Sequence, residues 1–209
     1  MRINLSNIKK AKKLLNKSEC VAIPTETVYG LAGNAYSDRA CKKIFKLKKR
    51  PKYNPLILHY ANLNKLREDA EFNISFIKLY KNLCPGPITF ILNKKKKSKI
   101  SRIANSRKKT IAIRFPKHKV IRDLLKMLNF PLAATSANIF SKLSPTSAKD
   151  VVDEFNKKIK IILDGGSCKI GLESTILDLT ARPTILRQGS ITQKKIEKIL
   201  KKKVYLNKK

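Results

Sequence analysis

The stretch Cys20-Val21-Ala22-Ile23-Pro24-Thr25-Glu26-Thr27-Val28-Tyr29-Gly30-Leu31 places a short apolar run directly before a polar turn. The run ends at Pro24 and is typical of a buried strand. The turn that follows brings together two threonine hydroxyls, the Glu26 carboxylate and the Tyr29 phenol. Small-molecule sites in α/β proteins gather where polar side chains follow buried strands. This stretch therefore predicts a strand that ends at a binding site.

Outward from this stretch, helical and strand-like segments alternate along most of the chain. The spacing of apolar residues predicts helices at about 6–17, 38–47, 73–83, 120–128, 147–155 and 192–200. Short apolar runs predict strands at 56–58, 88–92, 110–114, 131–134, 159–163, 174–179 and 184–186. Such alternation predicts an α/β domain with a twisted, mixed or partly parallel sheet flanked by helices. We expect one domain over residues 1–200 and a frayed, lysine-rich tail over 201–209.

The composition is strongly basic. The 209 residues include 48 Lys+Arg and 14 Asp+Glu, a formal net charge of +34. The positive charge comes from 38 lysines and only 10 arginines, beside 24 isoleucines and 15 asparagines, residues that AT-rich codons favour. One interpretation is a polyanionic partner such as RNA, a nucleotide or an anionic membrane, and the other is compositional drift. Because arginine is the better bidentate phosphate ligand, we favour drift and expect a few arginines to be informative.

Composition also argues against several classes of protein. The hydrophobic share of 42% supplies a core, so the high charge does not indicate disorder. No apolar stretch is as long as a membrane span requires, and residues 1–20 do not form a signal peptide, so a cytoplasmic protein without a membrane partner is expected. The cysteines lie too far apart to suggest a disulfide framework or a zinc site; they are Cys20, Cys41, Cys84 and Cys168.

Further polar or cationic segments follow other predicted elements. They are Lys48–His59, Arg114-Phe115-Pro116, Ala134–Asn138 and Ser144-Pro145-Thr146. The glycine spacing of Gly166–Gly171 matches a phosphate-binding P-loop, but Leu172-Glu173 stand where Lys and Ser or Thr are required. Any nucleotide site in this chain must therefore be unconventional.

Taken together, these segments resemble the YrdC/TsaC family of threonylcarbamoyl-AMP synthases, from about Val21 to Gly189. The shared motifs, in order, are P-T-E-T-x-Y-G-L at Pro24–Leu31, K-x-R-P at Lys48–Pro51, N-P-L-I-x-H at Asn54–His59, P-G-P-x-T at Pro85–Thr89, R-x-P at Arg114–Pro116, S-A-N at Ser136–Asn138, S-T-I at Ser174–Ile176 and R-x-G at Arg187–Gly189. Each motif alone is weak, whereas the ordered set is specific. Longer members of the family append a C-terminal domain, and the length of this chain leads us to expect the single-domain type.

The resemblance implies a YrdC-like fold around a cationic cavity and a nucleotidyltransferase activity. L-Threonine, bicarbonate and ATP would give threonylcarbamoyl-AMP and pyrophosphate. The product would be the donor for N6-threonylcarbamoyladenosine in tRNAs that read codons beginning with A, which implies threonylcarbamoyl transferase machinery as a partner. Mg²⁺ is expected to arrive with ATP, without a dedicated protein metal site. Such a reaction requires cations around the phosphates rather than a protein nucleophile.

The resemblance assigns contacts residue by residue. Lys48 and Arg50 are the expected catalytic clamps on the triphosphate, and the alternative for both is a solvated helix end. The expected ATP contacts are Lys48, Arg50, Asn54, Thr110, Ser136, Asn138, Ser144 and Arg187. The expected threonine contacts are Thr27, His59, Arg114, Ala134 (through its backbone) and Ser174. Glu26 has three open roles, which are to take up an amine proton, to coordinate Mg²⁺ or to pair with Lys48.

Two other functions stay open. A non-catalytic module of the same fold could hold double-stranded RNA or tRNA on a basic face, but such a module predicts aromatic side chains interleaved with arginine, and tryptophan is absent. A carbamoyltransferase module of hydrogenase maturation would need neighbouring zinc-finger and acylphosphatase domains, which the length and the scattered cysteines disfavour. The sequence leaves open the general base, the oligomeric state and whether tRNA docks directly, even weakly.

Overall fold

The computed structural model describes residues 5–155 and 158–207, and these form a mixed sheet with helices on its faces. The strands are β1 (Val21–Ile23), β2 (Gly30–Asn34), β3 (Ile57–His59), β4 (Ile88–Asn93), β5 (Thr110–Arg114), β6 (Leu132–Ser136), β7 (Thr175–Asp178), β8 (Thr184–Arg187) and β9 (Tyr205–Leu206). The helices are α1 (Leu5–Asn16), α2 (Asp38–Lys48), α3 (Leu63–Leu66), α4 (Ile74–Leu83), α5 (Lys119–Lys126), α6 (Ala148–Phe155) and α7 (Gln193–Leu200).

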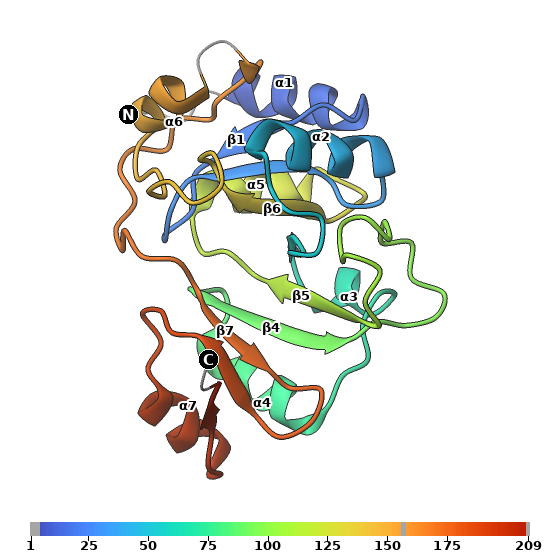
Figure 1. Cartoon of the computed structure of the whole chain (residues 1–209), viewed down its shortest axis with the longest axis vertical. Helices are drawn as coiled ribbons and strands as arrows, with labels where there is room; N and C mark the ends of the chain where they lie inside the picture. The colour runs from blue at the N-terminus through green and yellow to red at the C-terminus, as the bar shows by residue number, and fades with distance from the viewer. Residues whose placement is uncertain (1–4, 156–157, 208–209) are drawn as a thin grey trace.

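The sheet runs in the order β1-β2-β6-β3-β5-β4-β7-β8-β9. The pairs β3–β5, β4–β7 and β8–β9 are parallel, and the other neighbouring pairs are antiparallel. Helices α1, α2 and α5 lie at one end of the molecule with β1 and β6, and α4 and α7 lie at the other end with β4 and β7 (Figure 1). The predicted α/β class with a mixed, partly parallel sheet is confirmed.

Side-chain caps explain where three of the predicted helices begin. The Ser37 hydroxyl accepts a hydrogen bond from the Ala40 amide at the start of α2. Asn73 does the same for α4, and Thr192 for α7. A side-chain oxygen at this position satisfies an amide that the first turn leaves without a partner. The helices at 38–47, 73–83 and 192–200 therefore begin within a residue of their predicted positions.

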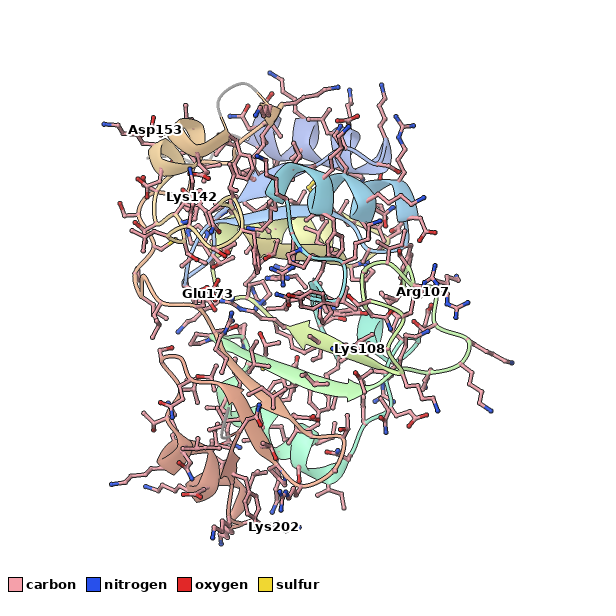
Figure 2. The ribbon with its side chains drawn as sticks, viewed as in Figure 1. Arg107, Lys108, Lys142, Asp153, Glu173 and Lys202 are labelled. Carbon is pink, nitrogen blue, oxygen red and sulfur yellow. The ribbon has the colours of Figure 1, made fainter. Side chains whose placement is uncertain are left out.

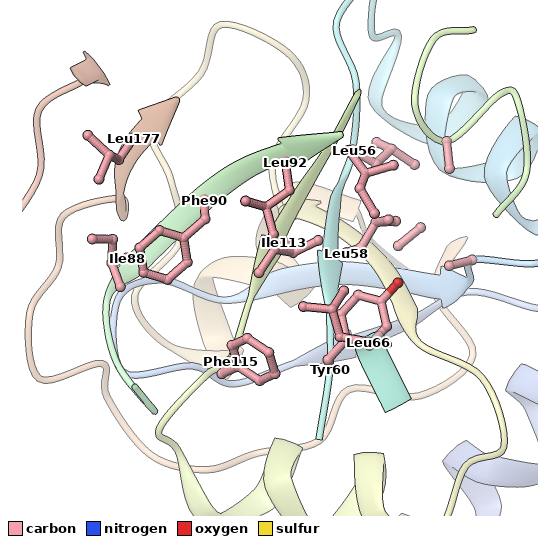
Figure 3. Close-up of a cluster of buried hydrophobic side chains, with 14 of the residues drawn as sticks. Leu56, Leu58, Tyr60, Leu66, Ile88, Phe90, Leu92, Ile113, Phe115 and Leu177 are labelled. Atoms are coloured by element: carbon pink, nitrogen blue, oxygen red, sulfur yellow. The ribbon is translucent and has the colours of Figure 1, made fainter. Parts of the chain in front are cut away.

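Two clusters of buried apolar side chains hold the layers together. The smaller one packs α1 and α5 against β1, β2 and β6. The larger one runs from α2 along β3, β5 and β4 to α4, β7 and α7, and its centre includes Leu58, Phe90, Ile113 and Phe115 (Figure 3). Burial on both sides of the sheet explains why most strands are continuous apolar runs.

Some predicted elements are wrong or missing. Residues 159–163 do not form a strand, because only Ile162 makes an isolated bridge, to Ala22. Strand β2 was not predicted, since its sequence Gly-Leu-Ala-Gly-Asn has low strand propensity. The fold compensates at Gly33, where a Cβ would lie 3.2 Å from the Ala40 Cβ, so that α2 packs directly on the strand. The short helix α3 was also not predicted.

The segment expected to be a frayed tail is ordered where the structure describes it. Val204 is 1% exposed, and Tyr205–Leu206 pairs with β8 as the parallel strand β9. The Gln193 side chain donates to the Val204 carbonyl at 2.8 Å, and the Glu197 carboxylate accepts from the Val204 amide at 3.0 Å. Lys208 and Lys209 lie outside the described residues. The expectation of fraying is therefore wrong for residues 204–206.

Candidate active site

A cavity of about 710 Å³ lies where the turn before β2 meets the end of α2 and strands β3, β5, β6, β7 and β8. Its lining includes every predicted site residue except Thr110. The cavity thus brings together predicted residues that are far apart in sequence, the first being Thr27 and the last Arg187. Thr110 starts β5 opposite Asn93, and its carbonyl accepts a hydrogen bond from Asn105. The lining takes Ala112 and Arg114 from that strand instead.

The described part of the lining carries more basic than acidic side chains. The basic residues are Lys48, Arg50, Lys108, Arg114, Lys142 and Arg187, and the acidic residue is Glu173. Glu173 lies between the two ends of the molecule and Lys142 lies in the upper end near α6, whereas Arg107 and Lys202 extend from the periphery (Figure 2). The sequence predicted no contact for Lys108, Lys142, Thr135 or Glu173, although Thr135 and Glu173 directly adjoin the S-A-N and S-T-I motifs.

Lys48 is buried at the end of α2 and holds the segment after β6. It is 1% exposed, and its ammonium donates to the carbonyl oxygens of Ser136 and Asn138 and to the Asn138 side-chain oxygen. The Asn138 amide in turn donates to the carbonyls of Ile139 and Lys142. Burial lowers the pKa of Lys48 to about 7, and the neighbouring charge of Arg50 acts in the same direction. All three ammonium donors are therefore engaged within the protein.

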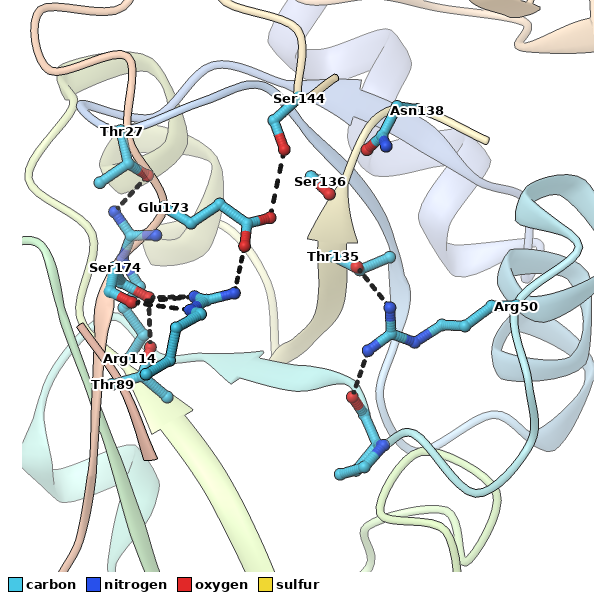
Figure 4. Close-up of polar contacts among 12 residues, drawn as sticks. Thr27, Arg50, Thr89, Arg114, Thr135, Ser136, Asn138, Ser144, Glu173 and Ser174 are labelled. Carbon is cyan, nitrogen blue, oxygen red and sulfur yellow. Dashed lines mark hydrogen bonds and ion pairs between the residues drawn. The ribbon is translucent and has the colours of Figure 1, made fainter. Parts of the chain in front are cut away.

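Arg50 follows α2 and keeps part of its guanidinium available. Its Nε donates to the Asn54 carbonyl at 2.9 Å, and its terminal nitrogens reach the Pro55 carbonyl at 3.1 Å and the Thr135 hydroxyl at 3.4 Å (Figure 4). The guanidinium carbon also lies 5.8 Å from the centre of the Phe140 ring. Since a guanidinium has five N–H donors, these contacts orient the fork and leave donors unused.

Arg114 lies at the end of β5 beside the turn that precedes β2. One terminal nitrogen donates to the Glu26 carboxylate at 2.8 Å and to the Thr27 hydroxyl at 2.9 Å. Its Nε is buried without a hydrogen-bond partner among the described residues. Burial would raise the pKa of Glu26, but the Arg114 guanidinium together with hydrogen bonds from backbone amides holds that pKa below its usual range. Glu26 thus pairs with Arg114, and its suggested pairing with Lys48 is wrong.

His59 ends β3 and is 4% exposed. Its Nδ1 lies 3.1 Å from the Ile57 carbonyl, and because a carbonyl only accepts, we assign the ring hydrogen to Nδ1. Burial lowers the pKa of His59 to about 3, and the Arg114 charge adds to the effect. The ring is therefore neutral near pH 7, with an acceptor lone pair on Nε2.

A polar network joins β7, β8 and the segment after β6 (Figure 4). The Ser174 and Thr89 hydroxyls are 2.8 Å apart, and Arg187 donates to the Ser174 carbonyl at 2.9 and 3.1 Å. Arg187 also pairs with the Glu173 carboxylate, which accepts from the Ser144 hydroxyl at 3.2 Å. Burial lowers the pKa of Arg187. A Cβ on Gly189 would lie 2.4 Å from the Thr175 nitrogen, so glycine lets the chain after β8 approach β7 this closely.

The sheet, the cavity and the converging arginine and hydroxyl groups define an α/β domain of the YrdC-like type. The family model Sua5_yciO_yrdC, described as "Telomere recombination", matches residues 13–189. The chain belongs to this family, as its motifs predicted.

Relatives and solved structures agree with this assignment. A threonylcarbamoyl-AMP synthase of Pyrococcus abyssi is 41% identical, over 95% of this chain and 58% of its own length. One of Bacillus subtilis is 40% identical, over 94% of this chain and 57% of its own length. The crystal structure of P. abyssi Sua5 complexed with L-threonine matches with a TM-score of 0.93 and 40% identity, covering 98% of this chain and 61% of that one. E. coli YciO, 24% identical with a TM-score of 0.83, supports the fold. This chain thus spans little more than half the length of the first curated relatives.

The described helices and side chains also bear on membranes and metals. None of the described helices is both long enough and apolar enough to cross a membrane. Within the same residues, no three side chains of His, Cys, Asp or Glu are grouped so that they could hold a metal ion.

Proposed function

We propose that this chain is a nucleotidyltransferase that forms threonylcarbamoyl-AMP and pyrophosphate from L-threonine, bicarbonate and ATP. The observation that carries the proposal is that one cavity is lined by all but one of the residues that the family resemblance assigns to ATP or threonine. Its volume of about 710 Å³ is in the range of small-molecule sites. The names of the relatives and the threonine complex of P. abyssi Sua5 support the choice of reaction.

The threonine end of the cavity would lie at Arg114 and His59. The unpartnered Nε of Arg114 is a buried cationic donor suited to the threonine carboxylate. The Nε2 lone pair of His59 would accept from the threonine amine or hydroxyl. Thr27 and Ser174 add hydroxyls, and Ala134 would act through its backbone.

The nucleotide end would lie at Arg50 and Arg187, with Asn54, Ser136 and Ser144 supplying polar contacts. The carbamate of threonine would attack the α-phosphorus, and charge would develop on the leaving pyrophosphate. Oriented cations stabilise that charge without further reorganisation. The exposed side chains of Lys108 and Lys142 would make the cavity mouth attractive to anions. Lys48, whose donors are engaged, would act by holding Ser136 and Asn138 in place.

Mg²⁺ would enter with ATP and keep phosphate and water ligands. The carboxylate described in the lining, Glu173, already contacts Arg187 and Ser144, so the residues present do not form an open carboxylate site. We therefore assign no step to a protein-bound metal. The product is a mixed anhydride, which a threonylcarbamoyl transferase acting on tRNA in the cytoplasm would consume. Weak direct docking of tRNA is part of the proposal.

The test is pyrophosphate release from ATP by the purified chain, with each of L-threonine and bicarbonate present or withheld. Release that requires both supports carbamate adenylation. Pyrophosphate release that is equally fast without L-threonine contradicts the proposal. No release, together with tight and salt-sensitive RNA binding, would favour the RNA-binding module instead.

A further inference from the structure

Glu173 is the carboxylate that the described lining places among six basic side chains. Its side chain is 35% exposed, so the carboxylate faces the cavity rather than the core. One carboxylate oxygen accepts from the Ser144 hydroxyl at 3.2 Å, and the other pairs with the Arg187 guanidinium (Figure 4). The carboxylate thereby links the segment after β6 to β8.

The family resemblance assigns both partners of Glu173 to ATP. A carboxylate and a phosphate accept the same charge-assisted hydrogen bonds from guanidinium and hydroxyl groups. Ser144 has a single hydroxyl hydrogen to donate. A phosphate oxygen that takes this hydrogen must therefore replace the Glu173 oxygen, and the two anions would also repel each other at short range.

The remaining donors of Arg187 limit how the conflict can be resolved. Its Nε donates to the Ser174 carbonyl, and one terminal nitrogen donates to the Ser174 carbonyl and hydroxyl. The nitrogen that pairs with Glu173 is the other one. The same Glu173 carboxylate accepts from Ser144, so a phosphate that binds both Ser144 and this nitrogen meets Glu173.

We propose that Glu173 is an internal competitor for the phosphate-binding donors, so that a polyphosphate ligand must displace its carboxylate from Ser144 and Arg187. The inference rests on the proposed function only in placing a polyphosphate at these donors. Glu173 would then set the affinity for phosphate-bearing ligands and leave the affinity for a neutral nucleoside unchanged. A purely structural role, in which Glu173 holds Arg187 and Ser144 in their binding positions, predicts the opposite effect of its removal.

The experiment is calorimetric titration of the full chain with inorganic tripolyphosphate at low salt and with a chelator, so that no metal takes part. Glu173→Gln removes the charge and nearly preserves the shape. The matched control is Glu19→Gln, which also removes one negative charge and breaks ion pairs, with Lys43 and Lys160, outside the cavity lining. We expect Glu173→Gln to tighten tripolyphosphate binding by about two- to fivefold, as expected for a partly exposed ion pair. The control should change it by less than about twofold, and adenosine binding should not change.

Unchanged or weaker tripolyphosphate binding by Glu173→Gln overturns the inference. If that variant does not fold, Glu173→Ala tests the same expectation without the amide group. The pyrophosphate-release assay of the unmodified chain is run in parallel. Tighter binding by the variant without threonine-dependent release by the unmodified chain supports the inference and overturns the proposed function. Threonine-dependent release without tighter binding supports the proposed function and overturns the inference. If no variant binds tripolyphosphate, the inference is overturned, and the release assay alone decides the proposed function.

Discussion

The Arg50 guanidinium uses three N–H groups on Asn54, Pro55 and Thr135 and faces the cavity with the rest of its fork. The Lys48 ammonium has no such surplus, because all three of its donors hold carbonyl or amide oxygens. The K-x-R-P motif therefore contains two cations with different tasks. The lysine shapes the segment after β6, and the arginine is oriented toward the cavity.

For Arg50→Ala we expect pyrophosphate release to fall by more than about 100-fold, because an oriented cation is lost from the phosphates. Arg50→Lys keeps the charge but loses the planar fork, and its rate of pyrophosphate release should be about tenfold lower than that of the unmodified chain. Steady-state release and the thermal midpoint measure activity and folding separately. Arg39→Ala, an exposed arginine on α2, is the control and should retain activity. Activity in Arg50→Ala close to that of the unmodified chain would remove Arg50 from the site.

His59 makes folding stability depend on pH. Its pKa is about 3 when folded and 6.5 as an unperturbed group, so between these values the unfolded chain binds a proton that the folded chain does not. The stabilisation is complete above pH 6.5 and is lost as the pH falls toward 3. Between pH 7 and pH 4 we expect the free energy of unfolding to fall by about 2–4 kcal/mol because of His59. His59→Gln should lack this contribution. Urea unfolding from pH 4 to 7 measures this loss, and equal pH dependence in both proteins would contradict it.

At the scale of elements, the sequence predicted those segments whose local signals agree with their packing. Capped helices such as α2, α4 and α7 and apolar strands such as β4 and β5 belong to this group. Strand β2 could not be predicted, because two glycines lower its propensity and its pairing with β1 and β6 is what fixes it. The contacts of Glu173 could not be predicted either, because its partners Ser144 and Arg187 lie 29 and 14 residues away in the sequence.

Strand β9 offers a test at the same scale. Val204→Ala should lower the free energy of unfolding by about 1–3 kcal/mol, because Val204 is 1% exposed. Leu206→Ala, two residues further on in β9 but 43% exposed, is the matched control and should cost less than about 1 kcal/mol. Chemical denaturation of both variants gives the comparison. If both substitutions were silent, this segment would behave as the frayed tail that its lysines suggested.

Across the whole molecule, which carries a net charge of +34, the share of arginine among the basic residues differs from its share in the cavity lining. Arginine supplies 10 of the 48 cations of the chain. In the described lining it supplies half of them, at Arg50, Arg114 and Arg187. Peripheral residues such as Arg107 and Lys202 are exposed, and salt screens their fields. This distribution agrees with drift at the surface and a chemical requirement in the cavity.

Reversal of surface charge tests this division. Lys96→Glu combined with Lys97→Glu changes two exposed residues that do not line the cavity. At physiological salt we expect pyrophosphate release to stay within about threefold of the unmodified chain, because exposed charges are screened beyond about 8 Å. Release at several salt concentrations is the measurement. A drop of more than about tenfold would mean that the overall field, rather than the cavity alone, draws the substrate in.

The burial of Lys48 also makes it a natural reporter of motion. Amine-reactive reagents modify exposed lysines freely, but the Lys48 amine is sealed by Ser136 and Asn138 and can react only when the segment after β6 moves away. Burial is also what lowers the pKa of this amine to about 7, so an uncovered Lys48 would react as an ordinary exposed lysine does. The rate at which Lys48 becomes labelled, read by mass spectrometry, would therefore time the opening of this wall of the cavity.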